Sequence, residues 1–213
     1  MAATIPSIAC LGVIGRNNNP LHITIFPSYD PASNTRAPLR TPLQFSLLLS
    51  STLDIFETRA RRAAPSTAGG APATAAASST PLLTGDFGLL HAVDERLAAY
   101  GFETNTGVKF VAVVDMRGRF SPVAAGSGGG GGGGAAGIRG GVGLRETELR
   151  VVFRAMQNAY VRLLQNPFYD PDEHAPLVLP PGGGVGGKKI TSRKFSEEMR
   201  RIGEGWAPGV TNL

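Results

Sequence analysis

The stretch IACLGVIGRNNNPLHITIF, residues 8–26, contains two strand patterns separated by a turn. Residues 8–14 are almost wholly apolar, which is typical of a strand covered on both faces. Residues 16–20 combine three asparagines with a proline; asparagine tolerates positive φ, and proline ends a strand ladder. Residues 21–26 alternate leucine and isoleucine with other side chains. We therefore predict a β-hairpin at the start of the chain.

Three later segments have helical periodicity. Residues 41–62 place one stripe of side chains at i, i+3, i+4, i+7 and i+11, and Thr41 before Pro42 is typical of a helix start. Residues 145–164 have the strongest amphipathic pattern, and residues 192–202 have a shorter one. The stripe of the first helix consists of Phe45, Leu48, Leu49, Thr52 and Phe56.

Three further segments, 87–93, 97–104 and 108–115, are short and strand-like. They lie close together in the chain, which favours an antiparallel meander. The resulting order, β-β-α-β-β-β-α-α, predicts an α+β fold. We expect a five-stranded antiparallel sheet with the first helix on one face and the last two helices on the other.

Two tracts contain no large apolar side chain and cannot offset the entropy of ordering. Residues 63–81 are all Ala, Pro, Ser, Thr or Gly, and residues 124–137 are all Gly, Ala or Ser. Residues 28–40 also look irregular. We expect one domain over residues 5–207, because no remaining block is large enough for a core of its own. Its expected interruptions are insertions at 63–81 and 117–144 and an irregular loop at 175–189.

Composition excludes several classes of protein. The net charge of the 213 residues is only +5, so the chain as a whole would attract nucleic acid or an acidic membrane only weakly. No apolar run approaches the roughly 18 residues of a membrane-spanning helix. Residues 1–7 carry no basic residue, so we expect no secretory signal. Cys10 is the only cysteine and lies in a strand pattern, which suits a reduced compartment and a core position.

Candidate chemistry is sparse. Residues 182–189 (GGGVGGKK) match most of a phosphate-binding loop, but Lys189 occupies the position of the required hydroxyl. A flexible linker is the better interpretation, and a nucleotide-dependent enzyme stays an alternative. The acidic loop at 170–174 lacks the glycine of a calcium loop. The three histidines, His22, His91 and His174, are scattered, so we predict no catalytic residue, metal site or cofactor.

The end of the chain is basic. Three glutamates, Glu197, Glu198 and Glu204, partly offset its positive charges. A solvated helix face is one interpretation, and an acidic partner or lipid surface is the other. Aromatic residues for stacking on bases are missing, so we expect no nucleic acid partner. The basic residues are Lys188, Lys189, Arg193, Lys194, Arg200 and Arg201.

Five stretches in the same order carry a family resemblance. They are IACLGVIGRNNNPLHI (8–23), LDIFE (53–57), YGFETN (100–105), VKFVAVVD (108–115) and NPFYDP (166–171). Together they resemble the sedlin family, the small longin-type subunits of the TRAPP vesicle-tethering complex, and above all its "subunit 2-like" branch. The low-complexity insertions fall between these stretches and suggest a fungal source.

The resemblance implies a longin-like fold and a non-catalytic subunit without cofactor. TRAPP assemblies activate Rab GTPases by nucleotide exchange, and this branch helps to assemble or stabilise the late-Golgi form. The implied partners are other TRAPP subunits and, indirectly, a Rab GTPase. The implied location is the cytoplasm, peripheral on endoplasmic reticulum and Golgi membranes through the complex. The alternative is a longin-type regulator or adaptor chain of other SNARE or coat machinery.

The resemblance also implies three residues for partner contact. Asp54 matches a family Leu-Asp position, and the stripe of its helix predicts that it points away from the core. An ordinary exposed carboxylate is the alternative. Phe168 and Tyr169 follow the long helix and could form an aromatic anchor, or could pack over the helix end.

Overall fold

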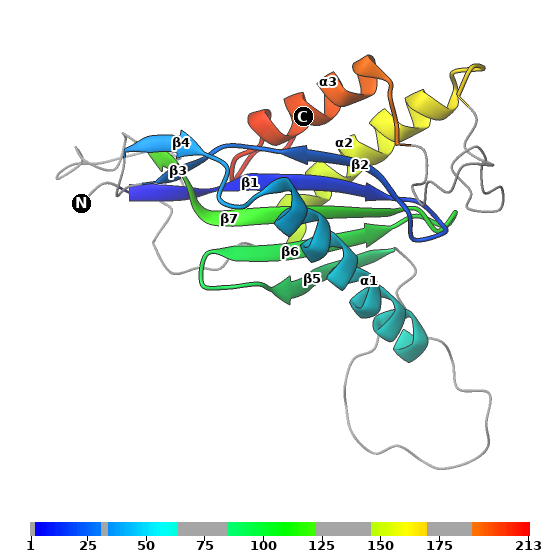
Figure 1. The fold of residues 1–213 in the computed structure, drawn as a ribbon, viewed down its shortest axis with the longest axis horizontal. Coiled ribbons are helices and arrows are strands. Elements are labelled where there is room, and N and C mark those ends of the chain that lie inside the picture. The colour runs from blue at the N-terminus through cyan, green and yellow to red at the C-terminus, as the bar shows by residue number, and fades with distance from the viewer. Residues whose placement is uncertain (1–2, 31–33, 64–84, 122–145, 170–188) are drawn as a thin grey trace, which may run out of the picture.

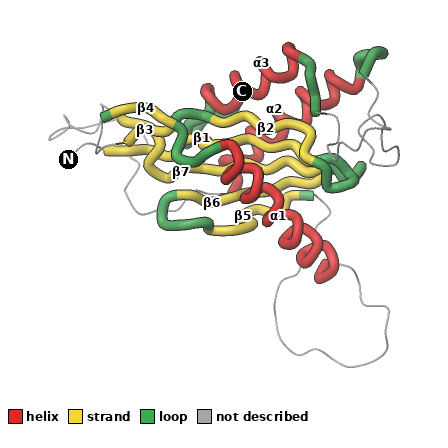
Figure 2. Tube along the Cα trace, viewed as in Figure 1, coloured by secondary structure: helices red, strands yellow, loops and turns green. Residues whose placement is uncertain are grey.

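The computed structural model describes residues 3–30, 34–63, 85–121, 146–169 and 189–213 (Figures 1 and 2). The strands are β1 (Ala3–Ile14), β2 (Pro20–Ile25), β3 (Ser28–Asp30), β4 (Thr35–Ala37), β5 (Asp86–Ala92), β6 (Leu97–Glu103) and β7 (Lys109–Ser121). The helices are α1 (Pro42–Ala63), α2 (Glu146–Leu164) and α3 (Arg193–Gly205). No helix in these ranges combines the length and apolar character that crossing a membrane requires.

The five-stranded antiparallel sheet is confirmed. Its strand order is β2-β1-β7-β6-β5, and every neighbouring pair runs antiparallel. The hairpin predicted over residues 8–26 supplies β1 and β2, and β7 is the central strand, between β1 and β6. Strands β3 and β4 pair separately as a small antiparallel hairpin. Strand β2 lies at one edge of the main sheet and β5 at the other (Figure 1).

The sheet separates two apolar clusters, as expected. One contains Phe45, Leu49 and Phe56 of α1 against Val111 and Val113 of β7. The other contains the buried stripes of α2 and α3 against the alternate residues of the same strands. Neighbouring residues of a strand point to opposite faces, so the apolar runs of β1 and β7 serve both clusters. The fold is the α+β arrangement that the element order predicted, and it agrees with the longin-like fold that the family resemblance implies.

Two expectations about irregular segments were wrong. Residues 28–40 contain β3 and β4. Residues 117–121, assigned to an insertion, continue β7, because Ala3, Thr4 and Ile5 extend β1 and pair with them beyond a bulge. The backbone hydrogen bonds to β1 hold these residues in a strand, although their composition is not typical of one. Helix α3 also continues past Ile202, since Gly203 leaves space for the ring of Phe26, which an added Cβ would meet at 2.1 Å.

The predicted starts of the helices rest on side-chain caps. The Gln44 backbone N–H donates to Thr41 Oγ1 at 3.3 Å, and the Thr41 N–H donates to Gln44 Oε1 at 2.9 Å. This reciprocal pair is a capping box. Ser192 caps α3 by accepting from the backbone N–H of Phe195. At the other end of α3, the indole of buried Trp206 donates to the Glu148 carbonyl oxygen of α2, which joins the two helices.

Candidate interaction surfaces

Helix α1 carries apolar side chains on the side turned away from the core. Leu43 is 70% exposed and Leu47 is 62% exposed. With Ser50 and Asp54 they follow at spacings of four, three and four residues, which places them on one line along the helix. We call these four residues the α1 crest. Large exposed leucines side by side on a helix are typical of a protein–protein contact surface.

The structure places Asp54 on this crest, exposed, with its backbone carbonyl accepting from the Thr58 hydroxyl at 2.7 Å. One turn further, Glu57 and Arg61 form an exposed ion pair at 3.4 Å. The outer side of α1 is therefore apolar in its first half and charged in its second half. Sequence reasoning missed Leu43 and Leu47, although their spacing from Asp54 would have identified them as residues opposite the buried stripe.

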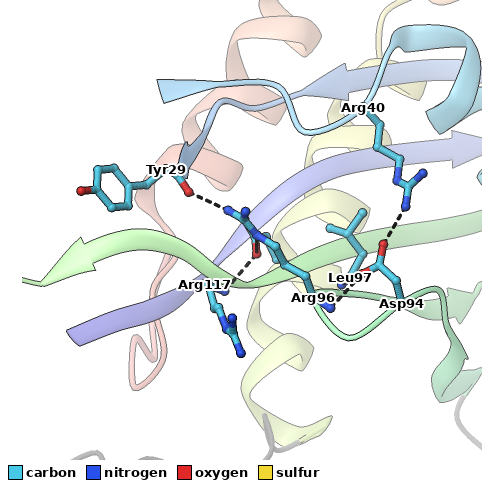
Figure 3. A network of polar contacts seen from close by, with 7 residues as sticks. Tyr29, Arg40, Asp94, Arg96, Leu97 and Arg117 are labelled. Atoms are coloured by element: carbon cyan, nitrogen blue, oxygen red, sulfur yellow. Dashed lines mark hydrogen bonds and ion pairs between the residues drawn. The ribbon is translucent and has the colours of Figure 1, made fainter. Parts of the chain in front are cut away.

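A polar network holds the start of α1 against the sheet (Figure 3). Arg40, just before the helix, donates to Asp94 Oδ2 at 2.6 Å. Asp94 Oδ1 accepts from the backbone N–H groups of Arg96 and Leu97. Burial raises the pKa of Asp94, but the hydrogen bonds from Arg40 and these two amides outweigh it and lower the pKa below its usual value. The residue before α1 is thereby tied to the β5–β6 turn.

The same turn is anchored by an ion pair with one buried partner. The Arg96 guanidinium donates to both oxygens of Asp115, at 2.8 and 2.9 Å, and Asp115 is fully buried. Arg96 also donates to the Tyr29 carbonyl oxygen of β3 at 2.6 Å, and the Arg117 N–H donates to Asp115 Oδ1 (Figure 3). The hydrogen bond to Asp115 raises the pKa of Arg96. Asp115 thus joins β7 to the β5–β6 turn, and Arg96 extends the connection to β3.

The second half of α1 is held by Arg59. Its guanidinium donates to the carbonyl oxygens of Phe87 and Leu89, both at 2.5 Å, and to that of Leu90 at 3.4 Å. These acceptors belong to the edge strand β5. Helix α1 is therefore tied to the sheet near both of its ends.

The two aromatic residues after α2 behave differently from one another. Phe168 is 95% exposed, whereas Tyr169 is partly buried against the core on the α2 side. Val161 and Leu164, in the last turn of α2, are also exposed, and Phe168 lies four residues beyond the end of the helix. Asp54 belongs to the helix on the opposite face of the sheet, so the structure does not bring the three predicted residues into one site.

The remaining candidates are structural where the structure describes them. His22 Nε2 lies 2.8 Å from Thr24 Oγ1, its ring contacts Phe195 edge-on at 5.2 Å, and burial lowers its pKa. Cys10 is buried in the core, and burial raises its pKa. His91 is exposed on β5. Within the described ranges, no group of three His, Cys, Asp or Glu residues could hold a metal ion. His174 and the segments 170–174 and 182–188 lie outside those ranges.

The acidic side chains at the basic end of the chain are all ion-paired. Three arginine–glutamate pairs link Arg193 to Glu197 at 2.9 Å, Arg200 to Glu204 at 2.7 Å, and Arg162 of α2 to Glu198 at 2.9 Å. Each glutamate of the last helix therefore has an arginine partner. The pairs of Arg193 and Arg200 fit a solvated helix face, and the positive charges of Lys189, Lys194 and Arg201 exceed the acidic ones.

These features define a class: a longin-like sheet with one helix on one face, two on the other, and an exposed apolar crest on the single helix. Residues 13–205 match the family described as Sedlin, and the chain belongs to this family. It is similar to trafficking protein particle complex subunit 2-like proteins. The mouse and cattle proteins are each 26% identical over 164 residues, which cover 77% of this chain and 84% of theirs. The Dictyostelium discoideum protein is 22% identical over 197 residues, covering 92% of this chain and 95% of its own.

Proposed function

We propose that this chain is a non-catalytic subunit of the TRAPP complex that helps to assemble or stabilise the complex, and that it binds neighbouring subunits through the α1 crest. Membership of the sedlin family and similarity to proteins named as subunits of that complex support the proposal. Residues 5–207 act as one domain in this role. Nucleotide exchange on a Rab GTPase, in traffic between the endoplasmic reticulum and the Golgi and at the late Golgi, belongs to the assembly as a whole.

The observation that carries the proposal is the exposure of Leu43 and Leu47 on a helix that is tied to the sheet at both ends. Leaving two leucines in water forgoes burial worth about 1.5–3 kcal/mol for each side chain. A partner that covers the crest recovers this free energy, and no large rearrangement of the helix is needed. Asp54 on the same line supplies a charge that a partner can recognise. The cytoplasmic and peripheral membrane location follows from the complex.

Phe168 and Tyr169 form the second proposed contact. Phe168 is exposed beyond the end of α2, whereas Tyr169 beside it packs on the core. The backbone that carries the exposed ring is therefore held in place by its neighbour. An aromatic side chain of this kind is a frequent anchor in interfaces. Because α1 and α2 lie on opposite faces of the sheet, the two contacts would serve two different neighbours.

The test is affinity purification of the tagged chain from its own cells, with co-eluting proteins identified by mass. We expect TRAPP subunits in stoichiometric amounts with the unaltered chain. The double variant Leu43→Ser/Leu47→Ser and the variant Asp54→Tyr should recover at least about fivefold less of the neighbour on the α1 side, because both alter the crest. Their melting temperatures should stay close to that of the unaltered chain, since the crest is outside the core.

The matched control is Glu57→Ser, which changes an exposed residue of the same helix beside the crest. It should leave recovery unchanged. Full recovery of every subunit by the double variant would show that the crest is not the contact. Recovery of SNARE or coat proteins without TRAPP subunits would instead favour the longin-type regulator.

A further inference from the structure

The two edges of the sheet are finished differently. At the β5 edge, the guanidinium of Arg59 occupies carbonyl oxygens of Phe87 and Leu89. The pairing of β5 with β6 is also irregular at two places within seven residues, between Asp86 and Gly88 and between Leu89 and His91. A charge and bulges are the usual devices that prevent another strand from adding to an edge. The outer edge of β5 is therefore protected against the addition of another strand.

The β2 edge has one register shift, beside Leu21, and its pairing with β1 is regular from His22 to Ile25. The Phe26 N–H donates to the Ala9 carbonyl oxygen at 2.9 Å, and the register pairs Thr24 with Leu11 and His22 with Val13. Hydrogen-bonded and non-hydrogen-bonded pairs alternate in an antiparallel ladder. The backbone groups of His22 and Thr24 thus face β1, and those of Ile23 and Ile25 face away from the sheet.

Part of this outer edge already takes a strand-like bond. The Ile190 N–H donates to the Leu21 carbonyl oxygen at 2.8 Å. Leu21 is the first outward-facing residue of β2, so Ile190 covers that end. The segment that follows, from Ile23 to Ile25, contains no charged residue and no proline. This segment can pair with one short extended strand, in which two alternate residues form the hydrogen bonds.

We propose that the outer edge of β2, from Ile23 to Ile25, receives an extended segment of a neighbouring subunit by strand addition; this rests on the proposed function. The edge offers two N–H groups and two carbonyl oxygens, which match two alternate residues of an incoming strand. Ile23 and Ile25 are partly buried beside the α1 cluster, so those two residues of the partner are apolar. The residue between them lies on the side of His22 and Thr24 and is polar.

The first test is amide hydrogen exchange at single-residue resolution, on the full chain alone and in the purified TRAPP assembly. Alone, the amides of Ile23 and Ile25 should exchange quickly, whereas that of Thr24, bonded to β1, should be protected. In the assembly both isoleucine amides should slow by about tenfold or more. Equal rates in the two states overturn the proposal: fast rates mean an unoccupied edge, and slow rates mean that this chain covers the edge itself.

The second test is co-purification with Ile23→Pro, which removes one outward N–H and none of the bonds to β1. Recovery of one neighbouring subunit should fall at least about fivefold. Ile23→Val is the matched control, since it keeps the N–H and most of the side chain, and it should recover normal amounts. Normal recovery with Ile23→Pro overturns strand addition and leaves the TRAPP assignment intact. If the unaltered chain recovers no TRAPP subunit, both proposals fail.

Discussion

The two faces of the sheet differ in what their helices leave exposed. On one face, α2 and α3 pack against each other as well as on the sheet, and Trp206 is buried where they meet. Their outer surface carries the ion pair of Arg162 with Glu198, and its exposed apolar residues, Val161 and Leu164, lie only in the last turn of α2. On the other face, α1 lies alone and exposes Leu43 and Leu47 on its crest.

This difference separates stability from recognition. A helix with a neighbour can bury a broad apolar surface, so the α2–α3 face adds most to the free energy of unfolding. A lone helix buries only the stripe that touches the sheet, and apolar residues on its outer side contribute little to the isolated fold. The leucines of the α1 crest are therefore best explained by contacts outside the chain.

The largest expected effect is on the two-helix face. Trp206→Ala should lower the free energy of unfolding by about 3–5 kcal/mol, because it removes a fully buried aromatic side chain and its hydrogen bond to Glu148. The measurement is equilibrium denaturant unfolding of the purified chain. The comparison variant is Leu47→Ser on the crest, which should change the same quantity by less than about 0.5 kcal/mol. Equal losses for the two variants would contradict the division between the faces.

A smaller loss of stability is expected at the polar network that supports the lone helix. Asp115→Ala should destabilise the chain by about 2 kcal/mol, because it leaves the partly buried guanidinium of Arg96 without its carboxylate. The loss is below the range for fully buried pairs, since water still reaches Arg96. The same denaturant titration measures it, with Glu57→Ala as a control that breaks an exposed pair and should cost almost nothing.

The network also connects stability to the crest. Through Asp94 it holds Arg40, which precedes α1. The Asp115 variant should therefore weaken recovery of the neighbour on the α1 side even at temperatures where the chain remains folded. Normal recovery under those conditions would show that the position of α1 does not depend on this ion pair.

The fold could be predicted because it depends on local patterns. The apolar runs and helical stripes near Ile8, Phe45 and Leu149 each specify an element and its buried side. The contacts made by polar side chains could not be predicted in this way. Arg59 lies near the end of its helix, where a basic side chain favours the helix dipole, but its partners are carbonyl groups about 30 residues later. Which distant group a long side chain reaches depends on how the elements pack.

The candidate site was partly predictable for the same reason. The exposure of Asp54 followed from its place opposite the stripe, since three turns of one helix determine it. The exposure of Phe168 beside a partly buried Tyr169 did not, because both residues follow the end of α2, where helical periodicity gives no orientation. The extension of β7 to Ser121 was missed, since its charged residues pair with β1 beyond a bulge. Strand length there is set by the partner strand and not by composition.

The smallest expected effect is a pH dependence confined to the two-helix face. Burial lowers the pKa of His22, whose ring contacts Phe195 of α3. The unfolded chain, with an ordinary histidine pKa of about 6.5, then binds more protons than the folded chain just below that pH. The contribution of His22 to stability is therefore fully present above about pH 7 and is lost as the pH falls through 6.5 towards the lowered folded value.

The measurement is the free energy of unfolding between pH 7.5 and 5, compared between the unaltered chain and His22→Gln, with pH values chosen to bracket the reference value of about 6.5. The variant should show a shallower decline in this range. Asp94 does not interfere, because its lowered pKa affects stability only below about pH 4. An equal decline in both proteins would mean that His22 is as accessible to protons in the folded chain as in the unfolded chain. The α3–β2 contact would then be open to water, and the α2–α3 face would be less closed than its buried aromatic residues indicate.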